Sequence, residues 1–277
     1  MALPTTRIEG LEISRLTCGS NPFFGFSHFS NARDVWMREW FTDERIVDVL
    51  VKCSEFGVNA VVSPTFERMH EALETTRDRT GKDFHWICTP GGALGDIHEG
   101  IKFCADRGVK ICMPHTSFTD ARLNINENRI DGIEPVLASI RDHGMIPGLS
   151  THRPEVLTVA QSAGYDVATC ILPLNVVGFL CAVETDWMAW VIQEYRKPVI
   201  CIKPFAAGRL MPRPGLDFAF RNCKPADMVC AGFLSPGEVE EDLKIAMDIL
   251  FGIDADVELT YSRSKQSLVQ KGSEKST

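Results

Sequence analysis

Four segments of the chain share one pattern, in which a helix-forming stretch ends at a glycine and a short apolar run follows directly. The segments read CSEFGVNAVVS, CADRGVKICMP, IRDHGMIPGLS and QSAGYDVATCIL. Glycine just past a helix accepts the left-handed conformation that closes it. An apolar run without polar alternation is typical of a strand that is buried on both faces. The pattern therefore predicts repeated helix-to-strand junctions in a parallel sheet.

Four further apolar runs complete a set of eight strand candidates: RLTCGSN, DFHWICTP, KPVICIKPF and ADMVCAGF. Between the runs we predict helices over residues 43–55, 67–78, 96–107, 130–143, 154–163, 184–195 and 237–249. The repeat of about 25 to 35 residues suits strand–helix–strand units. Eight such units in series predict an α/β protein that folds as a (β/α)8 TIM barrel. A doubly wound open sheet is the alternative, although no G-x-G-x-x-G motif follows the first strand.

The chain shows no internal linker, so we expect one barrel domain over residues 1–277. Its last stretch, SRSKQSLVQKGSEKST (262–277), is polar and is expected to be a frayed tail. Residues 22–42 form a long segment without a clear apolar period and with many aromatic side chains. We interpret this segment as a loop that could cover the mouth of the barrel.

Composition narrows the functional class. The 277 residues are 44% hydrophobic and 24% charged, as in an ordinary globular protein, and no apolar run is long enough to span a bilayer. The first residues, MALPTTRIEG, lack a secretory signal, so we expect a cytoplasmic protein. A net charge of -8 argues against the basic footprint of a nucleic-acid-binding protein. The expected partner is a small-molecule substrate.

The ten cysteines lie mostly within apolar segments, and no two have the Cys-x-x-Cys spacing of a zinc ribbon or a redox dithiol. We interpret them as reduced, buried, small hydrophobic residues. Cys112 alternates with Ile111 and Met113 along its strand, so its thiol should point away from the barrel interior. This orientation disfavours a cysteine–histidine pair with His115.

Barrel enzymes carry their chemistry where strands end and loops to helices begin. The side chains at these ends are Asn21, Ser63, Thr65, Thr89, His115, Thr116, Thr151, His152, Asn175, Lys203 and Ser235. His115 and His152 end neighbouring strands, so they could act together as general acid and base. The alternative is that each is a structural residue. Two histidines alone supply too few ligands for a catalytic metal, so a divalent metal is the weaker possibility.

Other strand-end residues could bind or activate a substrate. Lys203 ends an apolar strand, and burial would lower its pKa, which suits a base, a Schiff-base nucleophile or an anion clamp. It could equally extend its ammonium to water. Asn21, Thr116 and Asn175 could position substrate, although Asn175 could instead cap the following turn. Arg209 and Arg213 could bind a carboxylate or phosphate; solvation at the surface is the alternative.

Several stretches together resemble the aldo-keto reductase superfamily. The opening IEGLEISRLTCGSN is similar to the family's N-terminal hairpin, which closes the bottom of the barrel, and to its first strand. ICMPHTS resembles the fourth strand with its catalytic histidine, LPLNV the sixth strand, and IKPFAAGRL the seventh. VCAGFLSPGEVEEDLKIA resembles the eighth strand and the helix beside the cofactor. The resemblance spans nearly the whole chain and implies the family's barrel with a bottom hairpin, residues 1–14.

The same resemblance implies that the usual catalytic groups are replaced. The family's reductases use an aspartate, a tyrosine and a lysine together with the histidine. The best matches to the first three positions are Val61, Phe66 and Pro90, so only His115 remains. Phenylalanine has no proton to donate, and the protonation that follows hydride transfer would lack its acid.

The resemblance also bears on the cofactor. The family commonly binds the adenosine 2′-phosphate with a basic side chain after the eighth strand, where this chain has Leu234 and then acids. These acids are Glu238, Glu240, Glu241 and Asp242. Carboxylates repel a phosphate, which disfavours NADPH. NAD lacks this phosphate and is disfavoured less, and a site without a cofactor is the alternative.

We therefore predict an aldo-keto-reductase-like barrel enzyme that acts on a small hydroxy-carbonyl or sugar-type substrate. The expected chemistry is non-redox proton transfer, as in an isomerase or a lyase, carried by His115, His152 and Lys203. Asn21, Thr116, Asn175 and Arg209 are expected to bind the substrate. An atypical NAD-dependent oxidoreductase and a non-catalytic binding barrel are the alternatives.

Overall fold

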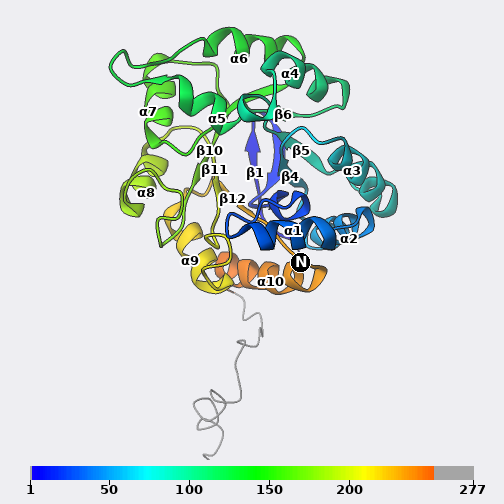
Figure 1. Ribbon diagram of the computed structural model, residues 1–277. Helices are drawn as coiled ribbons and strands as arrows, with labels where there is room; N and C mark the ends of the chain where they lie inside the picture. Colours follow the sequence, from blue (N-terminus) through cyan, green and yellow to red (C-terminus); the bar gives the residue numbers. More distant parts are fainter. Residues whose placement is uncertain (1, 253–277) are drawn as a thin grey trace, which may run out of the picture.

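Eight parallel strands close into a barrel in the computed structural model, which describes residues 2–252 (Figure 1). In chain order they are β3 (Leu16–Gly19), β4 (Ala60–Ser63), β5 (His85–Cys88), β6 (Ile111–Cys112), β9 (Ile146–Ser150), β10 (Thr169–Pro173), β11 (Val199–Ile202) and β12 (Met228–Ala231). Each strand pairs with its neighbours in sequence order, and β12 pairs with β3 to close the ring. The predicted (β/α)8 TIM barrel is confirmed.

The seven predicted helices surround this barrel, with ends within three residues of the predicted ones. They are α2 (Asp43–Glu55), α3 (Glu67–Thr80), α4 (Ile97–Asp106), α6 (Ile133–Asp142), α7 (Pro154–Ala163), α8 (Thr185–Glu194) and α10 (Pro236–Phe251). Apolar positions at helical spacing bury one face of each helix against the strands. No helix within residues 2–252 combines the length and the apolar character needed to cross a bilayer.

Three helices were not predicted from the sequence. The segment 22–42 is not only a loop, because it contains α1 (Asn31–Trp40), in which Met37 is the one buried residue. A helix this exposed shows no apolar period. α9 (Pro212–Asn222) begins with proline, which the first turn of a helix tolerates because its N–H groups have no intrahelical acceptor. The short α5 (Thr116–Thr119) follows β6, and an antiparallel pair, β7 (Leu123–Asn124) and β8 (Arg129–Ile130), precedes α6.

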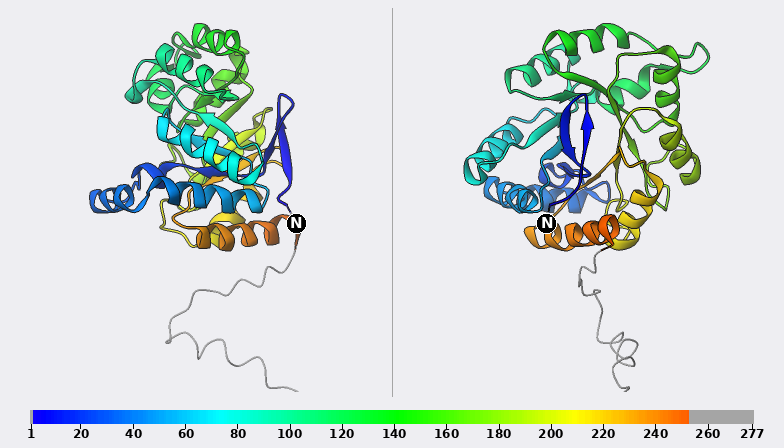
Figure 2. Two further views of the ribbon diagram at one scale, coloured as in Figure 1. Left: turned by 90° about the vertical axis from the view of Figure 1, so that its right-hand side faces the viewer. Right: turned by 180° about the vertical axis from the view of Figure 1, so that it is seen from behind.

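An antiparallel hairpin closes the N-terminal end of the barrel, as expected for residues 1–14. It consists of β1 (Thr5–Ile8) and β2 (Leu11–Ser14). Ile8 and Ile13 are fully buried and pack with the inward-facing strand residues. Figure 2 shows the hairpin at one end of the barrel, whereas the dark blue helix α1 projects at the opposite end. The strand ends that carry chemistry are therefore on the side away from the hairpin.

The core has an inner and an outer layer. Inward-facing side chains such as Ile111, Met113 and Ile200 fill the barrel, while the alternate positions pack against the helices. Cys112 belongs to the outer layer, which confirms its predicted orientation. The ten cysteines form no disulfide, and nine of them are buried.

The interior of the barrel is densely packed around Gly148. We therefore expect Gly148→Ala to destabilise the fold. A Cβ atom at Gly148 on β9 would lie 2.5 Å from Met113 Cε and 2.7 Å from the Thr169 carbonyl oxygen. Such overpacking costs about 1–3 kcal/mol of unfolding free energy, measurable by urea denaturation. Gly237→Ala is the matched control, since its Cβ would meet nothing closer than 3.6 Å. Equal unfolding midpoints for the two variants would contradict this view of the interior.

Candidate functional site

His115 follows β6 and is held in one orientation by its surroundings. Its backbone N–H donates to the Pro90 carbonyl at 2.8 Å. Its ring Nδ1 accepts from the Ser117 backbone N–H at 3.2 Å and lies 2.7 Å from Ser117 Oγ. Because a backbone N–H can only donate, Nδ1 is unprotonated and the ring proton of neutral His115 is on Nε2. His115 therefore has a hydrogen-bond donor on Nε2.

His152 follows β9 and differs from His115 in its surroundings. Its backbone N–H donates to Asp120 Oδ2 at 3.1 Å, and its ring Nδ1 lies 3.5 Å from Thr116 Oγ1. Burial lowers the pKa of His152 to about 4, and the positive charges of Lys203, His28 and His115 contribute to this shift. Burial also lowers the pKa of His115; Asp120 opposes that shift and Lys203 adds to it. Both histidines are neutral near pH 7.

Asp120 connects the two histidine segments and was not among the predicted site residues. It begins a 3-10 turn (Asp120–Arg122) directly after α5. Its carboxylate accepts from Thr116 Oγ1 at 2.8 Å, from the Thr151 hydroxyl and from the His152 N–H. These bonds tie the end of β9 to the segment after β6. The spacing of Thr116 and Asp120, one helical turn, is the sequence signal that could have indicated the residue.

Lys203 lies at the end of β11 in a left-handed backbone conformation, with φ of 64°. Burial lowers the pKa of its ammonium to about 8, while the thiols of Cys230 and Cys181 act in the opposite direction. The charge of Lys203 lowers the pKa values of His28, His115 and His152. The lysine and the histidines therefore share one region at the mouth of the barrel. His28, from the segment before α1, was not among the predicted residues.

The predicted substrate-binding residues have different positions. Asn175 is fully buried, and its amide exchanges two hydrogen bonds with the Phe179 backbone, at 2.8 and 3.0 Å. The Asn175 side chain thus closes its own turn, which is the structural role that the sequence left as the alternative, and substrate binding by Asn175 stays a prediction. Thr116 supports Asp120. Asn21 begins the 3-10 turn Asn21–Phe24, where its carbonyl accepts from the Phe26 N–H.

Arg209 lies at the mouth between two aromatic rings. The centre of its guanidinium is 4.3 Å from the Phe179 ring and 5.0 Å from the Phe29 ring. It donates to the Ala206 carbonyl at 3.0 Å. This arrangement holds a planar cation in a fixed orientation, as recognition of a carboxylate or phosphate requires.

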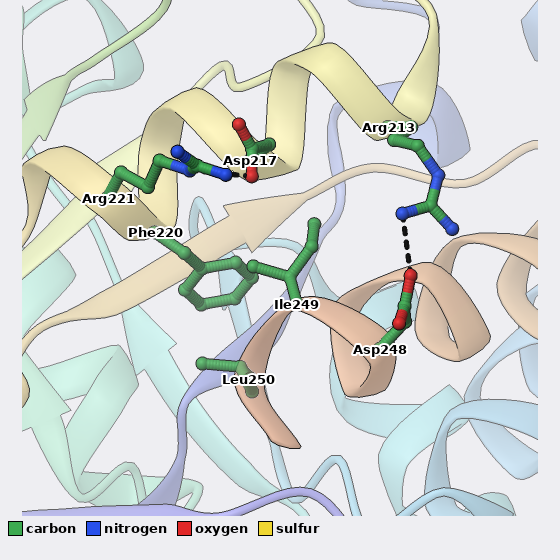
Figure 3. Close-up of a pocket in the computed structure, with 7 residues that line it drawn as sticks. All are labelled: Arg213, Asp217, Phe220, Arg221, Asp248, Ile249 and Leu250. Carbon is green, nitrogen blue, oxygen red and sulfur yellow. Dashed lines mark hydrogen bonds and ion pairs between the residues drawn. The ribbon is translucent and has the colours of Figure 1, made fainter. Parts of the chain in front are cut away.

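Arg213, the second predicted anion-binding candidate, lies elsewhere. It lines a hollow of about 410 Å³ between α9 and α10, shown in Figure 3. There Arg213 pairs with Asp248 at 2.6 Å, and Arg221 pairs with Asp217 at 2.8 Å. No strand-end residue lines this hollow. Its two arginines are neutralised, so we exclude it from the site.

The positions that the resemblance matched to the reductases' other catalytic groups carry apolar side chains. Val61, the position matched to the aspartate, belongs to the outer layer, and Val62 is the residue of β4 packed on the inner cluster. Pro90 follows Thr89, which continues the inward alternation of Ile87. Phe66 stacks on Phe24 with ring centroids 4.2 Å apart. Neither the matched positions nor their inward-facing neighbours carry a carboxylate, a phenol or an amine.

The start of α10 does not fit a 2′-phosphate. Ser235 accepts from the Glu238 N–H at 3.2 Å, and the Glu238 carboxylate accepts from the Leu234 N–H at 2.7 Å. A phosphate bound there would compete with a carboxylate for the same donor. Burial raises the pKa of Glu238 and raises that of Asp242, one turn further on, to about 8. Within residues 2–252, no three His, Cys, Asp or Glu side chains are grouped to hold a metal ion.

No protein-family model and no curated protein matches the sequence. Solved structures do resemble it. A Pseudomonas aeruginosa protein assigned to the aldo-keto reductases is 17% identical with a TM-score of 0.65, over 89% of this chain and 96% of that one. An aldo-keto reductase from Bacillus halodurans, in its holo form, is 14% identical with a TM-score of 0.62, over 98% and 96%. One from Klebsiella pneumoniae, in complex with NADPH, is 15% identical with a TM-score of 0.59, over 97% and 94%.

These similarities establish the fold. The chain is a closed parallel barrel with the architecture of the aldo-keto reductases, as the sequence motifs implied. At such low identity the similarity defines architecture and leaves the chemistry to the residues at the strand ends.

The electrostatic interaction between Lys203 and His152 at the mouth of the barrel can be tested by NMR. We expect the His152 ring to titrate near pH 4, and its pKa to rise in Lys203→Met because a neighbouring positive charge is removed. Nitrogen-15 chemical shifts of the imidazole measure both values. The folded pKa lies below the ordinary 6.5, so neutral His152 stabilises the fold above pH 6.5 and this contribution is lost as the pH falls toward 4. An unchanged pKa in Lys203→Met would show that the two groups do not face each other.

Proposed function

We propose that this protein is an enzyme with an aldo-keto-reductase-like barrel that acts on a small hydroxy-carbonyl compound, such as a sugar or a sugar acid. The proposed chemistry is proton transfer without hydride transfer, as in an isomerisation or an elimination. The observation that carries the proposal is the group of two neutral histidines, at the ends of the neighbouring strands β6 and β9, and one half-buried lysine at the end of β11.

Each group has a role that follows from its surroundings. His115 donates from Nε2 to the substrate carbonyl oxygen, because Nδ1 is occupied by Ser117. His152 is unprotonated near pH 7 and accepts the proton removed from the carbon beside the carbonyl. Lys203 supplies positive charge to the enolate-like intermediate in a site that is largely shielded from water. Growing negative charge on the substrate raises the proton affinity of His152 as the transfer proceeds.

Substrate binding is assigned to groups around this centre. Arg209 is stacked between Phe29 and Phe179 and has no carboxylate partner within residues 2–252, so it binds the acid group of a sugar acid. Asn21 contributes an amide from the end of β3. Asp120 is a positioning residue, since it fixes the backbone of His152 and the hydroxyl of Thr116.

An NAD-dependent oxidoreductase is the second candidate. Its support is the similarity to reductase structures, one of which holds NADPH, and the retained histidine. The acids at the start of α10 and the missing phenol weigh against it. We derive no step through a nicotinamide for this chain.

Replacement of His115 tests the proposal. We expect His115→Ala to lower turnover on a panel of aldoses, ketoses and sugar acids by about 100- to 10,000-fold, since a general acid is lost. His143→Ala is the matched control, because His143 is an exposed histidine at the end of α6. Interconversion of the substrates is followed by NMR. Full activity in His115→Ala would remove the histidine from the mechanism.

Cofactor titration separates the two candidates. We expect no change in nicotinamide fluorescence when the purified protein is titrated with NADH or NADPH to millimolar concentration. For NADPH the physical reason is that carboxylates at the start of α10 repel the 2′-phosphate; for NADH the expectation rests on the proposed non-redox chemistry. Saturable binding of NADH would support the oxidoreductase and overturn the non-redox proposal.

A further inference from the structure

The Lys203 amine lacks the partners that other lysines of this protein have. Lys224 pairs with Asp227 at 2.9 Å, and Lys82 donates to the Ser54 carbonyl at 2.8 Å. Within residues 2–252, no carboxylate pairs with Lys203 and no acceptor bonds to its Nζ. Lys203 is half-buried, and its Nζ keeps contact with solvent in place of an acidic partner. A partly desolvated amine without a counter-ion is a feature that concentrates at functional sites.

The backbone at Lys203 is arranged to present this amine to the mouth. Ile202 packs on the inner cluster, so the next residue of a regular strand would point to the outer layer. Instead the chain turns at φ of 64°, and the Lys203 carbonyl accepts from the Ala206 N–H at 2.9 Å. A left-handed conformation costs a non-glycine residue about 1–2 kcal/mol. Part of the side chain remains open to solvent, so a substrate can reach it.

Lys203 is surrounded by groups suited to proton transfer rather than to ion pairing. The titratable groups whose charges act on it, or on which its own charge acts, are the thiols of Cys181 and Cys230 and the rings of His28, His115 and His152. They come from five separate segments of the barrel. None of them is a carboxylate, so the amine is not fixed as a permanent ammonium by a counter-ion.

We propose that Lys203 is a covalent catalyst, whose Nζ forms a Schiff base with the carbonyl carbon of an aldehyde or ketone substrate. This inference deepens the proposed function and rests on it. The unpaired amine, its left-handed backbone and its place at the same rim of the barrel as the two histidine-bearing strand ends carry it. The substrate class is a small aldehyde or ketone with a hydroxyl next to the carbonyl.

The chemical step needs one proton from water and no other reactant. The free amine attacks the carbonyl carbon, a C–N bond forms, and the carbonyl electron pair moves onto the oxygen, which accepts a hydrogen bond from His115 Nε2. One proton passes from the nitrogen to His152 and from His152 to the oxygen, which gives a neutral carbinolamine. The hydroxyl then takes the proton from water and leaves as water when the C–O bond breaks, while the nitrogen lone pair forms the C=N bond of a protonated imine. A protonated imine withdraws electrons from the neighbouring carbon more strongly than a carbonyl group does. That carbon therefore loses its proton more easily.

The experiment is reductive trapping of the full-length protein. Dihydroxyacetone and glyceraldehyde are the probes, each added with sodium cyanoborohydride at pH 7, and the product is analysed by intact mass and peptide mapping. We expect one reduced adduct, on Lys203, with no adduct at this position in Lys203→Met. Lys244 is the internal control, because it is exposed on α10 and paired with Glu240 at 2.7 Å. Trapping should increase between pH 6 and pH 8, because the pKa of Lys203 is about 8 and only the free amine reacts.

The variant Lys203→Arg separates covalent catalysis from charge stabilisation. It keeps the positive charge but forms no imine, so we expect both the adduct and the turnover to be lost. Turnover that survives in Lys203→Arg, or label spread evenly over Lys244 and other surface lysines, would overturn the Schiff base. If trapping fails while His115→Ala still loses turnover, the covalent step is wrong and the proposed acid–base function stands. If Lys203 is trapped and His115→Ala is fully active, the proposed histidine role is wrong instead.

Discussion

Dense filling of the barrel interior is the constraint on which the rest of the structure depends. Isoleucines, methionines, small residues and the buried threonines Thr17 and Thr169 fill the interior, and the hairpin isoleucines Ile8 and Ile13 close the N-terminal end. The candidate polar side chains lie at the opposite end, where the strands stop. They are partly removed from water there, because the inner layer lies directly beneath them. This partial burial shifts the pKa values of His115, His152 and Lys203 downward.

One carboxylate organises this end of the barrel. Asp120 accepts hydrogen bonds from two threonine hydroxyls and from the His152 backbone, so its acceptor capacity is used by its neighbours. Lys203 is left without an acidic partner within residues 2–252. A partly desolvated cation without a counter-ion is unfavourable for stability and useful for chemistry. The left-handed backbone of Lys203 is a second local cost at the same place.

The barrel that the chain shares with the aldo-keto reductases carries its own set of groups at the strand ends. Val62 and Thr89 occupy the inward-facing positions of β4 and β5, and Phe66 contributes to an aromatic cluster. The Glu238 carboxylate accepts from the Leu234 backbone N–H at the start of α10. Architecture and chemistry are separable in barrels, because strands set the frame while the residues at their ends set the reaction.

The sequence by itself determined the barrel, seven of the helices and the location of His115, His152 and Lys203 at strand ends. These features follow from apolar runs and glycine-closed helices, which are local in the chain. It could not reveal the exposed helix α1, the proline-rich start of α9 or the role of Asp120. Only the tertiary structure decided that the Asn175 amide hydrogen-bonds to the Phe179 backbone within its own turn, and that Lys203 has no acidic partner among residues 2–252. Whether a polar group is satisfied depends on neighbours far away in the sequence, and that information arises only when the barrel closes.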